Sequence, residues 1–144
     1  MYHWQAAPSW YGARIVLIEP ERFVNGVRLN GYGLADDSVT LEWQLPARQV
    51  GADYQYSAQL YDEGGERVGQ LDARFWHGRH WCAGDRLLTW GPIEAQAGAT
   101  MLKVALYRLG AGKDAGQIVN LDLLDSQGNP KGQSVDITLG PHEA

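Results

Sequence analysis

The chain contains only one cysteine, Cys82, among its 144 residues. A lone cysteine has no partner for an internal disulfide, so the fold must be held together without such a link. Cysteine usage therefore decides nothing about the redox compartment and does not exclude an extracytoplasmic one. A chain of this length is expected to form one domain, which buries about two-thirds of the surface that its unfolded chain would expose.

The sequence also lacks any long apolar run. No stretch approaches the ~20 apolar residues that a membrane-spanning helix needs, and the N-terminal residues lack the basic start and apolar stretch of a signal peptide. We therefore expect the chain as given to be soluble, and its beginning to be a cut made in a longer protein. Residues 1–12 show no periodicity and are predicted to form a linker or an irregular lead-in, followed by a single domain over residues 13–144.

Basic residues are also scarce relative to acidic ones. The 12 lysines and arginines are outnumbered by 17 aspartates and glutamates, which gives a formal net charge of −5. Nucleic acids and anionic lipid surfaces attract proteins with clustered positive charge, and no cluster of lysine or arginine contradicts the average. Nucleic acid is therefore not an expected partner.

Alternating apolar and polar residues are abundant. In residues 39–45 the apolar side chains of Val39, Leu41, Trp43 and Leu45 alternate with polar ones, which is the period of a strand with one buried face. Residues 54–61 alternate in the same way and run into Asp62-Glu63-Gly64-Gly65, which predicts a hairpin turn. Residues 125–130 carry the same Asp-x-x-Gly pattern and predict a second turn between strands. Similar patterns and turn residues predict about nine short strands, over residues 13–18, 27–34, 39–45, 54–61, 66–72, 86–93, 101–109, 117–124 and 135–139.

These strands predict an all-β fold, namely an antiparallel two-layer β-sandwich of the immunoglobulin or jelly-roll kind. A closed barrel is the alternative architecture. The first strand is expected to stop at Glu19-Pro20-Glu21, because proline suits a strand end or an edge. Residues 110–115 fit a loose Gly-x-Gly-x-x-Ala pattern, but the alternation of residues 117–124 favours a hairpin loop over a nucleotide-binding turn that opens a helix.

The least regular stretch, residues 73–85, is dense in aromatic and basic side chains. An indole plane suits the apolar face of a pyranose, and the charged side chains of Arg74, Arg79 and Asp85 could bind sugar hydroxyls. The candidate sugar-contacting residues are Trp76, Arg79, Trp81 and Asp85. For Trp81 the alternative is that its indole folds inward and plugs the end of the sandwich.

The same loop holds His77, His80 and Cys82, whose spacing could offer two imidazoles and a thiolate to zinc. Such a site would need Asp85 or water as its fourth ligand. The alternative interpretation is that these histidines are amphipathic packing residues, and it is the one we adopt. No metal and no cofactor is therefore expected.

No catalytic constellation stands out. The adjacent acids Asp36-Asp37 and Asp62-Glu63 lie in predicted turns and point apart, whereas glycosidases hold two carboxyl groups across a cleft. There is no Gly-x-Ser-x-Gly elbow for a serine nucleophile. The domain is therefore not expected to be an enzyme.

Four segments in a fixed order point to a family. They are Val-Arg-Leu-Asn-Gly-Tyr-Gly-Leu at 27–34, Val-Thr-Leu-Glu-Trp-Gln at 39–44, the strand and Asp-x-x-Gly turn of 56–72, and Trp-Cys-Ala-Gly-Asp at 81–85 followed by residues 97–107. This order resembles that of the extracytoplasmic β-sandwich domain that follows the transmembrane part of bacterial polytopic glycosyltransferases similar to dolichyl-phosphate-mannose protein mannosyltransferases.

The resemblance covers roughly residues 25–140 and implies a non-catalytic accessory domain on the periplasmic or cell-surface face. The domain would be tethered to its own transmembrane region in the full-length protein and would contact a glycan or a lipid-linked sugar. The alternative function is an independent carbohydrate-binding or adhesion module without a membrane enzyme. A metal-dependent enzyme that uses the 73–85 loop is the third hypothesis.

Overall fold

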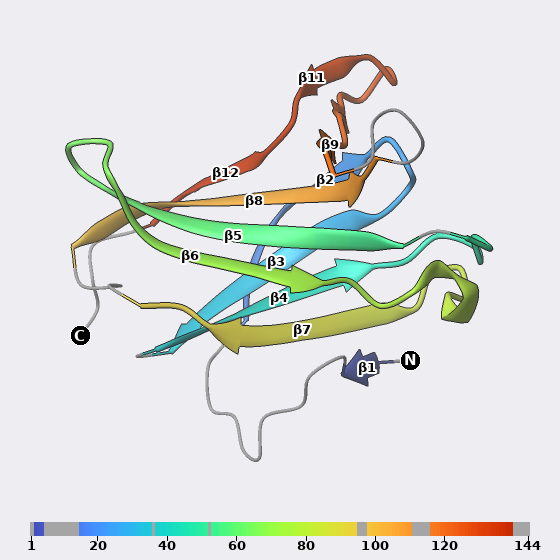
Figure 1. The fold of residues 1–144 in the computed structure, drawn as a ribbon, viewed down its shortest axis with the longest axis horizontal. Helices are drawn as coiled ribbons and strands as arrows, with labels where there is room; N and C mark the ends of the chain where they lie inside the picture. Colours follow the sequence, from blue (N-terminus) through green and yellow to red (C-terminus); the bar gives the residue numbers. More distant parts are fainter. Residues whose placement is uncertain are drawn as a thin grey trace.

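The computed structural model describes residues 2–4, 15–35, 37–51, 53–94, 98–110 and 116–139. Within these ranges the chain is almost entirely strand and turn, and its strands form two sheets (Figure 1). This arrangement confirms the predicted β-sandwich over the closed barrel. In the part of the chain that is described, no helix has the length and apolar character needed to cross a bilayer.

The larger sheet has seven strands in the order β1-β7-β4-β3-β2-β10-β11. Its neighbouring strands are antiparallel except for the parallel pair β1 and β7. The strands are β1 (Tyr2–Trp4), β2 (Val16–Phe23), β3 (Arg28–Ala35), β4 (Ser38–Gln44), β7 (Arg86–Pro92), β10 (Leu123–Leu124) and β11 (Pro130–Gly132).

The smaller sheet has five strands, and its main path is β12-β8-β5-β6. All of its pairs are antiparallel, and β9 shares the edge of β8 with β12. The strands are β5 (Tyr54–Asp62), β6 (Arg67–Arg74), β8 (Ala99–Leu109), β9 (Ile118–Asn120) and β12 (Val135–Thr138). Figure 1 shows β8, β5 and β6 running side by side.

The core lies between the sheets and is built from the alternating apolar faces. Val39, Leu41 and Trp43 of β4 are buried against the smaller sheet, as the alternation of residues 39–45 predicts. The indole of Trp43 meets Phe75 edge-on at a centroid distance of 5.0 Å, and its Nε1 donates a hydrogen bond of 2.9 Å to the buried Thr89 hydroxyl. A buried indole N–H needs such an acceptor, so Trp43 joins β4 and β7 through polar as well as apolar contacts.

Both predicted Asp-x-x-Gly turns are present. After β5, Gly65 has a φ of +83°, and the Asp62 carboxylate accepts a hydrogen bond from the backbone of Glu66. After β10, Gly128 has a φ of +82°, and the Asp125 carboxylate accepts from two backbone N–H groups. Glycine adopts these left-handed conformations at little cost, which explains why the same residue pattern closes two hairpins far apart in the chain.

Pro20 does not end the first strand of the domain, in contrast to the prediction. β2 continues through it to Phe23, and the β2–β3 register shifts between Leu17 and Glu21. A bulge places the proline where no ladder hydrogen bond is required of it. On the other side of β2, β10 pairs only with Arg22 and Phe23, so the missing N–H group of Pro20 breaks no hydrogen bond there.

The predicted strand over residues 117–124 is two strands in different sheets. The Leu121 N–H still donates to Leu106 of β8, whereas the Asp122 carbonyl accepts from Val24, next to β2. The chain therefore leaves the smaller sheet and joins the larger one between these two residues. Leu121 and Leu123 are buried, as the alternation indicates, and they lie in the core between the sheets.

Two predicted irregular regions are partly described. Tyr2–Trp4, expected in the lead-in, form β1, and the lead-in residues 5–12 lie outside the described residues. The predicted loop at 110–115 also lies largely outside them. Its ends are described: Gly110 donates to Gln117, and β8 pairs with β9 in the antiparallel sense that a hairpin requires.

Candidate functional site

The loop between β6 and β7 is anchored at its start by the core. The Phe75 N–H donates to the Tyr54 carbonyl at 2.9 Å and so extends the β5–β6 ladder by one step beyond Arg74. The Phe75 ring is buried and packs edge-on against Trp43. The next residue, Trp76, therefore leaves the sheet at a fixed position.

The end of the loop is held by the backbone of Leu45, just after β4. Leu45 donates to the Asp85 carbonyl at 2.8 Å and accepts from the Gly84 N–H at 2.9 Å. Gly84 has a φ of +84°, a conformation that favours glycine. Asp85 thus helps to shape the loop through its main chain.

A single 3-10 turn, Gly78–His80, forms the tip of the loop. The Nδ1 atom of His77 accepts a hydrogen bond of 3.1 Å from the Arg79 N–H and caps the turn. The Trp81 N–H then donates to the Gly78 carbonyl and closes it. His77 therefore has a structural role that keeps Arg79 and His80 on the outside of the loop.

Trp81 lies inside the sandwich, so the inward alternative is the one observed. Its side chain is 2 % exposed, stacks on Tyr54 at a centroid distance of 6.0 Å and meets Phe75 edge-on at 5.9 Å. Its Nε1 donates a hydrogen bond of 2.8 Å to the Trp76 carbonyl. Because both faces of this indole are enclosed, we correct the prediction that Trp81 contacts a sugar.

Trp76 lies at the surface side of the same corner. Its ring is partly buried against the core and stacks on the exposed imidazole of His80, with 5.4 Å between centroids and 16° between planes. The Arg79 Nε donates to the His80 Nε2 at 3.2 Å. Trp76, Arg79 and His80 are thus brought into one aromatic and basic group.

This group lines an open depression of about 510 Å³ at the end of the sandwich. Of the four residues predicted to contact sugar, Trp76 and Arg79 line it, whereas Trp81 and Asp85 do not. The described residues that line it are Asp53, Arg74, Phe75, Trp76, His77, Arg79 and His80. Arg74, expected from the sequence to bind sugar hydroxyls, also lines it, whereas Asp53 was not singled out, because it precedes β5 and reaches this corner only through strand pairing.

The charges in the depression are mostly exposed. Arg74 and Asp53 approach to 3.6 Å with side-chain exposures of 77 % and 56 %, and such exposed ion pairs contribute only ~0–1 kcal/mol. Arg79 forms no ion pair with a carboxylate within the described ranges. Its guanidinium therefore keeps donors available beside the Trp76–His80 stack.

The zinc alternative for His77, His80 and Cys82 is not supported by the geometry. No three histidine, cysteine, aspartate or glutamate side chains gather into a metal-binding group in the described residues. His77 uses Nδ1 as the acceptor for Arg79, and the Nε2 of His80 faces the Arg79 guanidinium, a cation. Ligand lone pairs that already accept hydrogen bonds are poorly placed for zinc.

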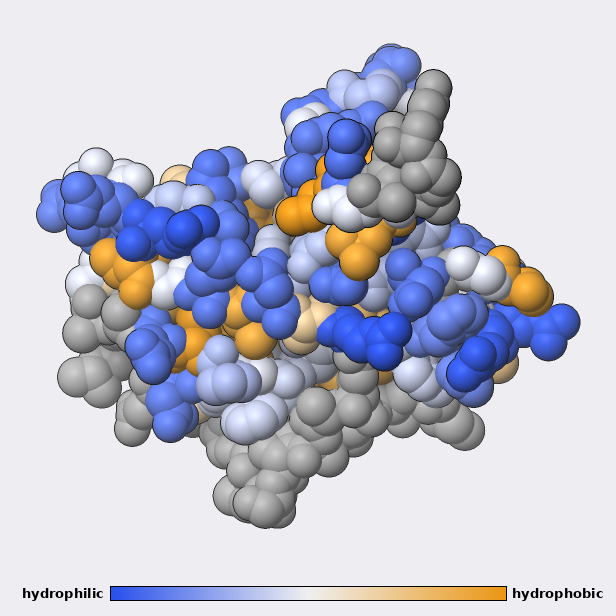
Figure 2. Space-filling view, viewed as in Figure 1, coloured by the Kyte–Doolittle hydropathy of each residue, from blue (hydrophilic) through white to orange (hydrophobic). Residues whose placement is uncertain are grey.

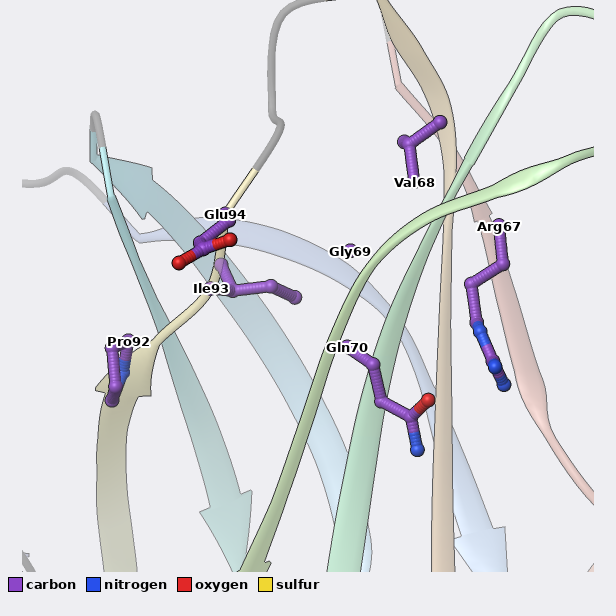
Figure 3. A pocket seen from close by; sticks show the side chains of 7 residues that line it. All are labelled: Arg67, Val68, Gly69, Gln70, Pro92, Ile93 and Glu94. Carbon is purple, nitrogen blue, oxygen red and sulfur yellow. The ribbon is translucent and has the colours of Figure 1, made fainter.

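A second hollow, of about 430 Å³, lies at the opposite end of β6 (Figure 3). It forms where β6 of the smaller sheet meets the end of β7 of the larger one, and Figure 3 shows the Ile93 side chain pointing toward Gly69. A Cβ atom at Gly69 would lie 2.3 Å from the Glu94 carbonyl oxygen. The hollow therefore marks a close approach of two backbones, and none of the described residues that line it is aromatic.

A third hollow, of about 270 Å³, lies on the outer face of the smaller sheet, whose mainly hydrophilic surface is visible in Figure 2. Outward-facing side chains of β5 and β8 meet Asn120, Gln133 and Ser134 there. Its lining is Ser57, Gln59, Lys103, Ala105, Asn120, Gln133 and Ser134. The alternation of residues 54–61 signals the first two of these, but only the fold adds the segment near residue 133.

No protein-family model, no curated protein and no solved structure matches this chain. The site is therefore interpreted from its own geometry.

Proposed function

We propose that this chain is a non-catalytic, carbohydrate-binding β-sandwich module that acts as the extracytoplasmic accessory domain of a membrane glycosyltransferase-like protein. The observation that carries the binding role is the partly buried Trp76, stacked on His80 in a depression that Arg79 also lines. An indole in such a place offers a flat apolar surface to a sugar ring, and nearby charged groups take its hydroxyls.

The size of the depression suits a small ligand. Sites for small molecules usually enclose ~300–1,000 Å³, and the depression measures about 510 Å³. Trp76 is also well supported, because its carbonyl is held by Trp81 and its ring packs against the core. A supported aromatic ring loses little conformational entropy when a ligand binds.

A binding role is favoured over hydrolysis by the acids in the depression. Among the described residues that line the depression, Asp53 is the only carboxylate, and it lies within 3.6 Å of Arg74. Glycoside hydrolysis by the usual route needs two carboxyl groups, about 5–9.5 Å apart, across the scissile bond. We therefore propose that any sugar bound here leaves unchanged.

The binding role can be tested with a panel of saccharides and two tryptophan variants. Trp76→Ala removes the proposed platform, whereas Trp90→Ala removes a partly buried indole of β7 that does not line the depression. We expect the wild type and Trp90→Ala to bind the same sugar, and Trp76→Ala to bind it at least about tenfold more weakly, ~1.4 kcal/mol. Equal binding by the two variants would contradict the proposal, as would a Trp76 indole NMR signal that no saccharide shifts.

The accessory role rests on the segment order described above and needs a different test. The reading frame upstream of the codon for Met1 should encode many apolar spans if the domain is tethered to a membrane enzyme. A signal peptide or another soluble domain in that position would instead favour the independent carbohydrate-binding or adhesion module. The saccharide measurement does not depend on this result, because both forms use the same depression.

A further inference from the structure

The depression around Trp76 is basic in an acidic protein. Its lining includes two arginines, two histidines and one aspartate, whereas the whole chain carries a net charge of −5. With neutral histidines these described lining residues carry a net charge of +1, two positive charges less one negative. The hollow near Pro20 offers a comparison: it is lined by Arg22, Arg28 and Lys131 against Glu19, Glu21 and Asp125, so its charges cancel.

We infer that the depression selects saccharides that carry an acidic group, a phosphate or a carboxylate. The inference rests on the proposed carbohydrate-binding role and names the class of sugar. In this arrangement the sugar ring lies on Trp76, and the acidic group meets the guanidinium of Arg79, with Arg74 lining the same hollow.

The geometry of Arg79 carries the argument. His77 accepts a hydrogen bond of 3.1 Å from its backbone N–H and fixes its main chain, and the hydrogen bond of 3.2 Å from its Nε to His80 orients its side chain beside the stack. The Nε bond leaves the terminal N–H groups of the guanidinium for a ligand. A guanidinium presents paired donors that match phosphate and carboxylate oxygens, and such charge-assisted bonds are about twice as strong as neutral ones.

Arg74 adds a second positive charge at the same hollow. Its contact with Asp53 is long, at 3.6 Å, and exposed. A surface pair of this kind is weak, so an incoming anion competes for Arg74 at little cost. The two arginines come from the end of β6 and from the 3-10 turn, which are held at fixed positions by the Phe75 and Trp81 contacts.

The test compares three ligands of one ring size: glucose, glucose 6-phosphate and glucuronate. At low ionic strength we expect both acidic sugars to bind at least about tenfold more tightly than glucose and to weaken as salt is added, because exposed charges are screened by salt. The stronger of the two acids identifies the natural source of the charge. Inorganic phosphate alone should bind more weakly than glucose 6-phosphate, because it lacks a ring for Trp76.

The variants provide a matched control on a single strand. Arg74→Gln and Arg67→Gln make the same change of charge at opposite ends of β6, about 23 Å apart at the usual rise of a strand. We expect Arg74→Gln and Arg79→Gln to reduce the preference for acidic sugars several-fold, and Arg67→Gln to leave it unchanged. Equal losses in Arg74→Gln and Arg67→Gln would overturn the inference, since net charge and not the depression would then be responsible.

The failures of the two proposals are distinguishable. If glucose binds as tightly as the acidic sugars and only Trp76→Ala weakens it, the acidic preference is overturned and the carbohydrate-binding role stands. If none of the saccharides in the wider panel binds, both are overturned. If inorganic phosphate binds as tightly as glucose 6-phosphate, the hollow recognises the anion alone, and the sugar class named here is wrong.

Discussion

The indole Nε1 of Trp81 donates a hydrogen bond of 2.8 Å to the main-chain carbonyl of Trp76. This contact gives the two tryptophans of the corner opposite roles. The indole of Trp81 is enclosed by Tyr54 and Phe75 and donates the hydrogen bond. Trp76 accepts this bond through its main-chain carbonyl and not through its ring. The ring of Trp76 stacks on His80 instead and lines the surface depression.

Replacing Trp81 with Phe should destabilise the domain by about 1–3 kcal/mol, because the Trp76 carbonyl loses its buried donor and the core loses part of a packed ring. Urea unfolding followed by circular dichroism measures the change. Trp76→Phe should cost clearly less, since the carbonyl remains. Equal costs for the two variants would show that the hydrogen bond does not separate their roles.

The pair Trp43 and Thr89 offers a test of the core. Thr89→Val leaves the buried indole N–H of Trp43 without its acceptor and should cost about 1–3 kcal/mol. Burial raises the pKa of Tyr56, and a side-chain hydrogen bond with Thr89 partly opposes this, so the valine affects Tyr56 as well. A double-mutant cycle with Trp43→Phe measures the coupling free energy between Trp43 and Thr89 separately from the effect on Tyr56. Additive free energies of unfolding would contradict the coupling.

Gly69 is expected to tolerate no side chain. A Cβ atom there would lie 2.3 Å from the Glu94 carbonyl oxygen, a backbone atom that cannot rotate away. Gly69→Ala should therefore lower the free energy of unfolding by about 1–3 kcal/mol, the usual cost of overpacking. Gly64→Ala in the neighbouring turn meets only Asp62, at 3.4 Å, and serves as the control with little effect. Similar unfolding curves for both variants would refute the close approach.

Asp125, in the turn after β10, is expected to make the stability of the domain depend on pH. Hydrogen bonds from the backbone of Asn129, and then of Gln127, lower the pKa of the Asp125 carboxyl below its ordinary value. A lowered pKa in the folded state means that this carboxylate adds stability at neutral pH, which is lost as the pH falls through the lowered value.

The Asp125→Asn variant keeps an acceptor oxygen and loses the charge. We expect it to be less stable than the wild type at neutral pH, and the difference to shrink in strongly acidic solution. Chemical unfolding of both proteins across this range measures the change. A difference that stays constant with pH would show that the charge contributes nothing.

Much of the fold could be predicted from local patterns. The alternation around Trp43 and Tyr56 identifies two central strands and their buried faces, and Asp with Gly at fixed spacing identifies both hairpin turns. These signals are readable because each reports a backbone conformation set by near neighbours in sequence.

Other features depended on distant residues. The alternation of residues 117–124 runs without a break across Leu121 and Asp122, although the chain changes sheets there. Likewise, the apolar and polar pattern of β4 predicts one wet face, but Thr40 and Glu42 are also buried, and Glu42 is held by Arg86 at 2.8 Å. Periodicity does not report which strand lies beside another, or what covers an outer face.

The candidate site, too, has features that local sequence predicts and features that depend on distant residues. The sequence by itself determined that an aromatic and basic loop joins two strands and that Trp76 and Arg79 belong to it. Only the tertiary structure decided that Trp81 turns inward while Trp76 stays at the surface, and that Asp53 lies beside Arg74 in the same hollow. The reason is physical: a loop without periodicity has no preferred inner face until the packed sheets provide a core for one indole and leave the other beside solvent.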